Sequence, residues 1–237
     1  MTKKKRRGLI VLLIIEAAVA VAVMVILFGF KTKNVICEGN TRLEDSQISE
    51  YIFQGKLPNA VIYKLFGNKN KHVPFVEKYD VSIAKPDTLK LTIHEREYYG
   101  YFKIENTNFY FDKTGTITDV SERQLEGVTP VEGAGFIPVR EGENITLANE
   151  QFGKGLMTFA NSFYEYKIPS DKITFDDKGD YVLKIKDVTV LCGPAEYTDE
   201  KMDRLSRLIP EMQDLKGVLH LEKFDGTEKN VYFNKSE

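Results

Sequence analysis

Cysteine and histidine are scarce in this chain of 237 residues, which holds two of the first and three of the second. Cys37 and Cys192 lie far apart in the sequence and in different predicted domains, so we expect two buried thiols rather than a disulfide framework. His72, His94 and His220 stand singly, with no cysteine or carboxylate at the spacing of metal ligands. The sequence therefore predicts no metal site.

The motifs of common enzyme classes are missing as well. The chain has no glycine-rich phosphate loop, and no Ser-x-x-Lys motif occurs with the partner boxes of a transpeptidase. Asp176 and Asp177 are adjacent and precede a Lys-Gly turn, a pattern typical of solvated turn charges rather than of a catalytic carboxylate pair. We therefore expect no catalytic residue, no cofactor and no enzymatic activity.

Long apolar segments are also scarce: residues 8–30 form one, and no second follows. Its 23 residues are enough to cross a hydrocarbon core of about 30 Å at roughly 1.5 Å per residue. The segment comes directly after five basic residues, Lys3, Lys4, Lys5, Arg6 and Arg7. Because basic flanks stay on the cytoplasmic side, we expect a cytoplasmic tail at residues 1–7, a transmembrane helix at 8–30 and residues 31–237 outside the cytoplasm.

A cleaved signal peptide is the alternative interpretation of this segment. Signal peptides have an apolar region of roughly 7–15 residues and a cleavage site of small residues. Here the apolar run is longer and leaves through Leu27-Phe28-Gly29-Phe30-Lys31, without an Ala-x-Ala pattern and without a lipidation cysteine. We favour an uncleaved anchor.

Glu16 is an acidic residue inside the apolar segment. A carboxylate at membrane depth is costly and is a functional candidate for that reason. Two interpretations stay open: the side chain is tolerated through tilt, local water or protonation, or it faces a polar or basic group of a partner helix.

The charge of the remainder limits the classes of partner. Residues 31–237 carry a net charge of −6, because the first 30 residues contribute five basic and one acidic side chain to a total of −2. An acidic exterior argues against nucleic acid and against binding of anionic lipid by charge alone.

Residues 31–97 show the pattern of a small α/β domain. A β-prone run at 34–38 is followed by a helix after residues 41–46, with Ile48, Tyr51 and Ile52 as its buried face. A second apolar set at 59–66 fits a short helix or loop, and two alternating runs flank a turn at Pro86-Asp87. The order strand, helix, helix, strand, strand predicts two helices on one face of a mixed three-stranded sheet.

Residues 98–233 predict a second, mostly antiparallel β domain with helices, so that the fold class is α+β. The elements expected are a hairpin with its turn at 112–115, a helix through 152–163, strands at 173–176, 181–185 and 188–193, a helix at 201–209, and a last hairpin from 218–221 and 230–233. We expect residues 234–237 to form a C-terminal tail.

The order of these pieces resembles the FtsQ/DivIB family of bacterial cell-division proteins. Cys37-Glu38-Gly39-Asn40 with Arg42-Leu43 is similar to the opening of a POTRA domain, and residues 85–93 followed by Glu95-Arg96 are similar to its close. The proline often found just after Glu-Arg is absent. If Glu95 and Arg96 form an exposed ion pair, it contributes little. Phe109 to Ile117 resembles the hairpin that opens the family's β domain.

The resemblance implies a scaffold of the division septum in the cell membrane. In the family, the C-terminal strands of the β domain bind a small bitopic partner of the FtsB/DivIC type, alongside FtsL. The residues that fall on this edge are Lys229, Asn230, Val231, Tyr232 and Phe233. Tyr232 and Phe233 point to opposite faces of a strand, so one can anchor in the core while the other contacts a partner. The strand at 79–85 is a second candidate for pairing with extended segments.

Two other functions are weighed against this one. An envelope sensor or cell-wall-binding module needs an aromatic platform, for which the cluster Tyr98, Tyr99, Tyr101 and Phe102 is the candidate. A POTRA-bearing transport component needs a barrel or several such repeats, and the sequence shows neither.

Overall fold

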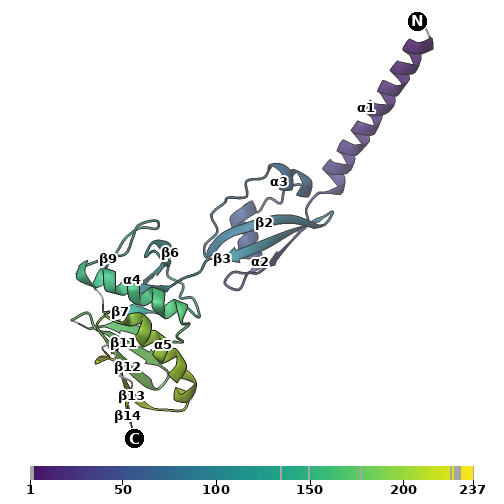
Figure 1. The fold of residues 1–237 in the computed structure, drawn as a ribbon. Helices are drawn as coiled ribbons and strands as arrows, with labels where there is room; N and C mark the ends of the chain where they lie inside the picture. Colours follow the sequence, from purple (N-terminus) through teal and green to yellow (C-terminus); the bar gives the residue numbers. More distant parts are fainter. Residues whose placement is uncertain are drawn as a thin grey trace. The chain divides into compact units, whose positions relative to one another are not determined.

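The computed structural model describes residues 3–133, 135–148, 150–176, 178–224, 226 and 231–236. The chain divides into two compact units, Met1–Arg96 and Glu97–Glu237 (Figure 1). Across the described residues the fold is mixed, with five α-helices and several β-sheets.

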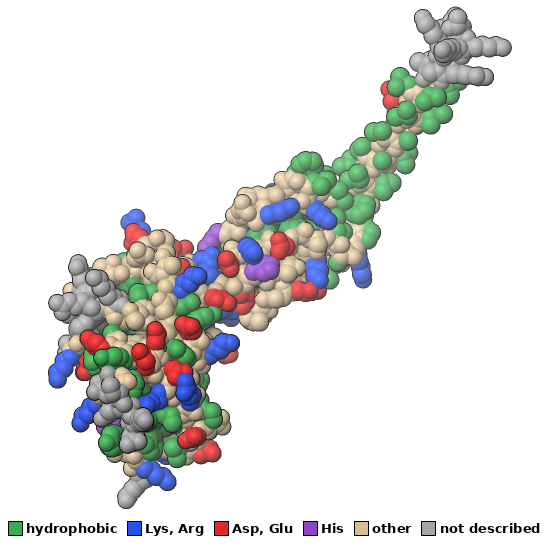
Figure 2. All heavy atoms as spheres, viewed as in Figure 1, with side chains coloured by type: hydrophobic (Ala, Val, Ile, Leu, Met, Phe, Trp, Pro, Cys, Tyr) green, Lys and Arg blue, Asp and Glu red, His purple; other side chains and the backbone are tan. Residues whose placement is uncertain are grey.

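The first unit begins with a long helix, α1 (Lys3–Gly29). Its part Ile10–Gly29 is long and apolar enough to cross a membrane. Figure 2 shows apolar side chains along this helix, and residues such as Ile14 and Met24 are more than half exposed in the isolated chain. The helix starts before residue 8, so the backbone of the basic cluster is helical too.

The rest of the first unit follows the predicted order. Its elements are β1 (Asn34–Glu38), α2 (Asp45–Phe53), α3 (Ala60–Phe66), β2 (Val76–Lys85) and β3 (Thr88–Glu95). The sheet order is β1-β3-β2, with β1 parallel to β3 and β2 antiparallel to it. This is the mixed three-stranded sheet expected from the sequence.

The buried face of α2 differs from the predicted one. Ile48 and Ile52 are fully buried, but Tyr51 is 47% exposed and Phe53 is buried in its place. The ring of Phe53 meets Tyr63 of α3 edge-on, with 5.0 Å between the centroids. α3 thus covers the side of α2 that carries Phe53, and Tyr51 stays exposed.

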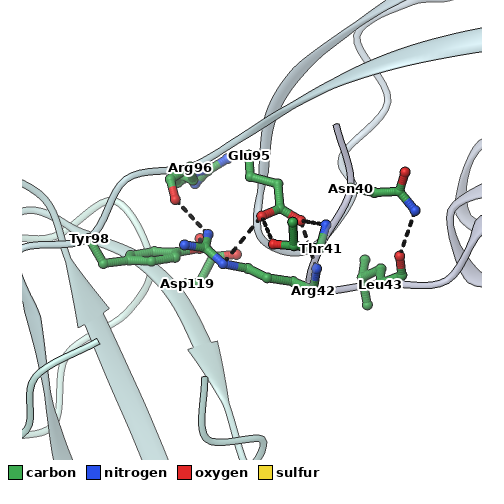
Figure 3. Close-up of polar contacts among 8 residues, drawn as sticks. All are labelled: Asn40, Thr41, Arg42, Leu43, Glu95, Arg96, Tyr98 and Asp119. Atoms are coloured by element: carbon green, nitrogen blue, oxygen red, sulfur yellow. Dashed lines mark hydrogen bonds and ion pairs between the residues drawn. The ribbon is translucent and has the colours of Figure 1, made fainter. Parts of the chain in front are cut away.

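The opening motif of this unit (residues 37–43) and its closing motif (residues 85–96) meet around Glu95 (Figure 3). Its carboxylate accepts hydrogen bonds from Thr41 N, Thr41 Oγ1 and Arg42 N at 2.6, 2.7 and 2.8 Å, and Arg42 Nη1 donates to the carbonyl of Arg96. Burial alone raises the pKa of Glu95, but these hydrogen bonds and the charge of Arg42 outweigh it and lower the pKa. Glu95 therefore pairs with the loop after β1, and Arg42 lies within ion-pair distance of it, with 3.6 Å between Arg42 Nε and Glu95 Oε2.

Gly39, in the opening motif, adopts a backbone conformation and a close contact that a side chain would not allow. Its φ is +87°, and a Cβ there would lie 2.5 Å from the carbonyl oxygen of Ile93. The next residue, Asn40, donates to Leu43 O and to Asp45 Oδ1, which fixes the entry into α2.

The second unit contains three sheets in its described part. The strands are β4 (Gly100–Ile104), β5 (Thr107–Phe111), β6 (Ile117–Ser121), β7 (Val131–Glu132), β8 (Phe136–Ile137), β9 (Thr146–Leu147), β10 (Lys172–Phe175), β11 (Tyr181–Ile185), β12 (Val188–Gly193), β13 (Gly217–His220) and β14 (Tyr232–Lys235). The helices are α4 (Glu150–Glu165), α5 (Thr198–Leu208) and the 3-10 turn η1 (Ile209–Met212).

The largest sheet has the order β14-β13-β12-β11-β10-β7. Leu156 and Phe159 of α4 and Met202 and Leu205 of α5 are buried in the core that this sheet shares. Because β14 runs to Lys235, residues 234 and 235 belong to a strand, and the prediction of a tail from 234 is wrong at those positions.

Both cysteines are buried free thiols, and burial raises the pKa of each to about 12.

Candidate partner-binding edge

The last strand, β14, occupies one end of the six-stranded sheet. It pairs antiparallel with β13, placing Gly217 opposite Lys235, Leu219 opposite Phe233 and His220 opposite Tyr232. Within the described part of the chain, no strand pairs with the other side of β14. An extended segment from another protein could therefore add to the sheet here.

The two aromatic residues of β14 have different environments. Phe233 is partly buried and packs against the core of the second unit, whereas the side chain of Tyr232 is 62% exposed. Val231, just before the strand, also packs against the core. Lys229 and Asn230, the other two residues predicted for this edge, lie outside the described residues.

A surface pocket of about 440 Å³ lies beside the exposed ring of Tyr232. It is lined by residues of α5, β13, the segment after β13, and β14: Arg204, His220, Leu221, Glu222, Lys223, Phe224, Val231, Tyr232 and Asn234. The guanidinium carbon of Arg204 lies 4.8 Å from the centroid of the Phe224 ring, a cation–π contact.

A chain of polar contacts crosses this pocket. His220 Nδ1 lies 2.8 Å from Glu222 Oε1, and His220 Nε2 lies 3.0 Å from Asn234 Nδ2. With the Asn234 amide as donor, Nε2 accepts and the Nδ1–H donates to Glu222. Arg204 Nη1 and Glu222 Oε2 are buried with no hydrogen-bond partner among the described residues. The lining of the pocket thus includes one guanidinium and one carboxylate, each with one buried atom that no described residue satisfies.

A buried lysine fixes the helix that carries Arg204. Lys201 is 2% exposed, and its Nζ donates to the carbonyl of Pro194 at 2.8 Å. Burial lowers the pKa of Lys201, although Cys192, Glu196 and other acidic groups act in the opposite direction. The contact ties the first turn of α5 to the segment after β12, and Arg204 follows three residues later.

The other predicted surfaces have different outcomes. The strand at 79–85 lies within β2, which is an edge strand of the three-stranded sheet. In the aromatic cluster, Tyr98, Tyr101 and Phe102 are buried, and Tyr99 stacks on Tyr164 with 4.1 Å between the ring centroids. The cluster is therefore no open platform for a glycan. In the part of the chain that is described, no three His, Cys, Asp or Glu side chains are grouped to hold a metal ion.

Sequence reasoning identified the strand but missed the pocket. Arg204 comes from α5, whereas Glu222 and Phe224 come from the segment after β13, and no spacing in the sequence marks a common site. Glu16 lies on α1, with its side chain exposed in the isolated chain.

Comparisons with known proteins do not assign the chain to a family. No protein-family model matches it, and no curated protein sequence matches it.

Proposed function

We propose that this chain is a bitopic membrane scaffold of the bacterial division machinery, similar to FtsQ/DivIB proteins. In this proposal α1 is the membrane anchor, the rest of the first unit is a POTRA-type domain, and the second unit binds FtsB/DivIC-like and FtsL-like partners outside the cytoplasm at the septum. The protein acts through surfaces rather than through catalysis.

The observation that carries the proposal is the arrangement of β14. An edge strand, an outward-facing Tyr232 and an adjacent pocket with unsatisfied polar atoms are features of a site for strand addition. The partner strand pairs with the free side of β14, and one of its side chains enters the pocket. Aromatic residues at such positions commonly account for a large part of binding energy.

A titration of the full chain in nanodiscs with the extracytoplasmic segment of an FtsB/DivIC-like partner tests this function. Tyr232→Ala is expected to weaken binding at least tenfold, and Val231→Lys to weaken it as well. Tyr51→Ala is the matched control, because Tyr51 is also an exposed tyrosine but lies on α2 of the first unit. Tight binding that Tyr232→Ala leaves unchanged would contradict the edge-strand proposal.

A cellular experiment tests the division role separately. Depletion of the protein should give filaments with unfinished septa, and re-expression of the Tyr232→Ala variant should restore division less well than the wild-type chain. Cells that divide normally without the protein would count against the role in division.

A further inference from the structure

The short helix α3 turns its larger apolar side chains outward. Ile62, Leu65 and Phe66 are 42%, 65% and 82% exposed, and they follow the i, i+3, i+4 spacing of one helix face. The residues that α3 buries are Ala60 and Tyr63. Three neighbouring apolar side chains of α3 are thus exposed on the surface of the first unit.

The helix is fastened to the end of the apolar segment of α1. Asn59 Nδ2 donates to the carbonyl of Ile26 at 2.6 Å, and Asn59 Oδ1 accepts from Val61 N and Ile62 N. The backbone N–H of Ala60 donates to Phe30 O at 2.8 Å. One asparagine therefore caps the last turn of α1 and the first turn of α3 together.

The charge around α3 is of one sign. Residues 51–76 contain four lysines, Lys56, Lys64, Lys69 and Lys71, and no acidic residue, although residues 31–237 as a whole are acidic. Lys71 donates to Ile52 O, and the side chains of the other three are exposed. Figure 2 shows apolar side chains on the surface over α3 with basic ones beside them. Exposed apolar residues flanked by lysine are typical of helices that lie in a membrane interface.

We propose that α3 lies in the headgroup region of the bilayer that α1 crosses, on the side where α1 ends. Ile62, Leu65 and Phe66 enter the boundary of the acyl chains, and Lys56, Lys64 and Lys69 face lipid phosphates. The proposal rests on membrane insertion of α1 and is independent of the proposed division partners. It holds for either orientation of α1, because it concerns only the end to which α3 is attached.

Continuity with the span explains how so small a helix can bind lipid. Because Asn59 and Ala60 bond to Ile26 O and Phe30 O, α3 is held beside the end of α1, and its binding to the membrane carries little further cost of association. The apolar residues, rather than net charge, determine the contact. In this position, α3 limits rotation of the rest of the first unit about α1.

The absence of tryptophan from the chain permits a direct test. We would place one tryptophan in the full chain, as Phe66→Trp, in nanodiscs of phosphatidylcholine with or without brominated acyl chains. Met24→Trp in α1 reports insertion of the span, and Tyr51→Trp on α2 is the exposed control. We expect brominated lipid to quench Phe66→Trp severalfold more than Tyr51→Trp, and to quench Met24→Trp as well.

The outcomes separate the possible occupants of this face. Quenching of Phe66→Trp no greater than that of Tyr51→Trp, with a water-like emission maximum, would overturn the proposal. A blue-shifted emission that brominated lipid leaves unquenched would also overturn it, because a second copy or another protein then covers the helix. Failure of Met24→Trp to be quenched would remove the membrane span on which the proposal rests.

Discussion

The carboxylate of Glu95 accepts hydrogen bonds from both the hydroxyl and the backbone N–H of Thr41, although the two residues are 54 positions apart. The contact joins the end of β3 to the loop between β1 and α2. The parallel pair β1–β3 is thereby closed at the end where the chain leaves the first unit.

Glu95→Gln should lower the free energy of unfolding of the first unit by about 1–3 kcal/mol, because hydrogen bonds to a charged group are lost and an amide N–H₂ is placed against N–H donors. Chemical denaturation followed by circular dichroism measures the change. Glu77→Gln is the matched control, since Glu77 is exposed on β2. Equal effects of the two changes would contradict a special role for Glu95.

The same contact predicts a dependence of stability on pH. The folded-state pKa of Glu95 is lowered below its ordinary value of about 4.5, so the folded state favours the ionised carboxylate. Its stabilisation is complete above that value and is lost as pH falls through it to the folded-state pKa. The stability difference between the wild-type chain and Glu95→Gln should therefore shrink below about pH 4.5. A difference that grows on acidification would show that the sign is wrong.

Tyr232 and Phe233 should respond differently to truncation. Phe233→Ala removes a ring that packs on the core and should cost about 1–3 kcal/mol of stability, since the ring is only partly buried. Tyr232→Ala should change stability by less than about 0.5 kcal/mol, as is usual for exposed positions. Urea denaturation of both variants makes the comparison. A large loss for Tyr232→Ala would mean that the weaker partner binding expected for this variant reflects unfolding.

The sequence predicts the parts of this fold that depend on local pattern. Alternation on both sides of Pro86-Asp87 is enough to predict β2 and β3, because a half-buried strand has a period of two. The exposure of Tyr51 could not be predicted, because it depends on where α3 packs. The same limit applies to the pocket, where Arg204 contacts Phe224 only because the chain returns from α5 to β13. Long-range packing of this kind leaves no periodic mark in the sequence.

Gly217→Ala should displace β14 and weaken partner binding at least tenfold. A Cβ at this position would lie 2.1 Å from the carbonyl oxygen of Asn234, so the β13–β14 pairing cannot persist unchanged. Gly142→Ala is the control, because it has a positive φ of +86° and no atom within 4 Å of the added Cβ. The control should lose about 1 kcal/mol through backbone strain and keep full binding. Titration with the partner segment measures both variants, and unchanged binding by Gly217→Ala would exclude β14 as the docking edge.

Two substitutions at Asn59 should separate its two roles. Asn59→Asp keeps an oxygen that accepts from Val61 N and Ile62 N but removes the donor to Ile26 O, so the cap of α3 is retained and the tie to α1 is lost. Asn59→Ala removes both and should cost about 1 kcal/mol of stability, the usual value of an N-cap. Denaturation in detergent micelles should therefore place both variants below wild type, because Asn59→Asp loses the bond to Ile26 O and sets a carboxylate against that carbonyl, and Asn59→Ala loses the cap as well. Bromolipid quenching of the Phe66→Trp reporter should fall in both variants, since both remove the bond from the Asn59 side chain to Ile26 O. Loss of quenching in Asn59→Ala alone would show that the cap, and not the tie to Ile26, places the helix.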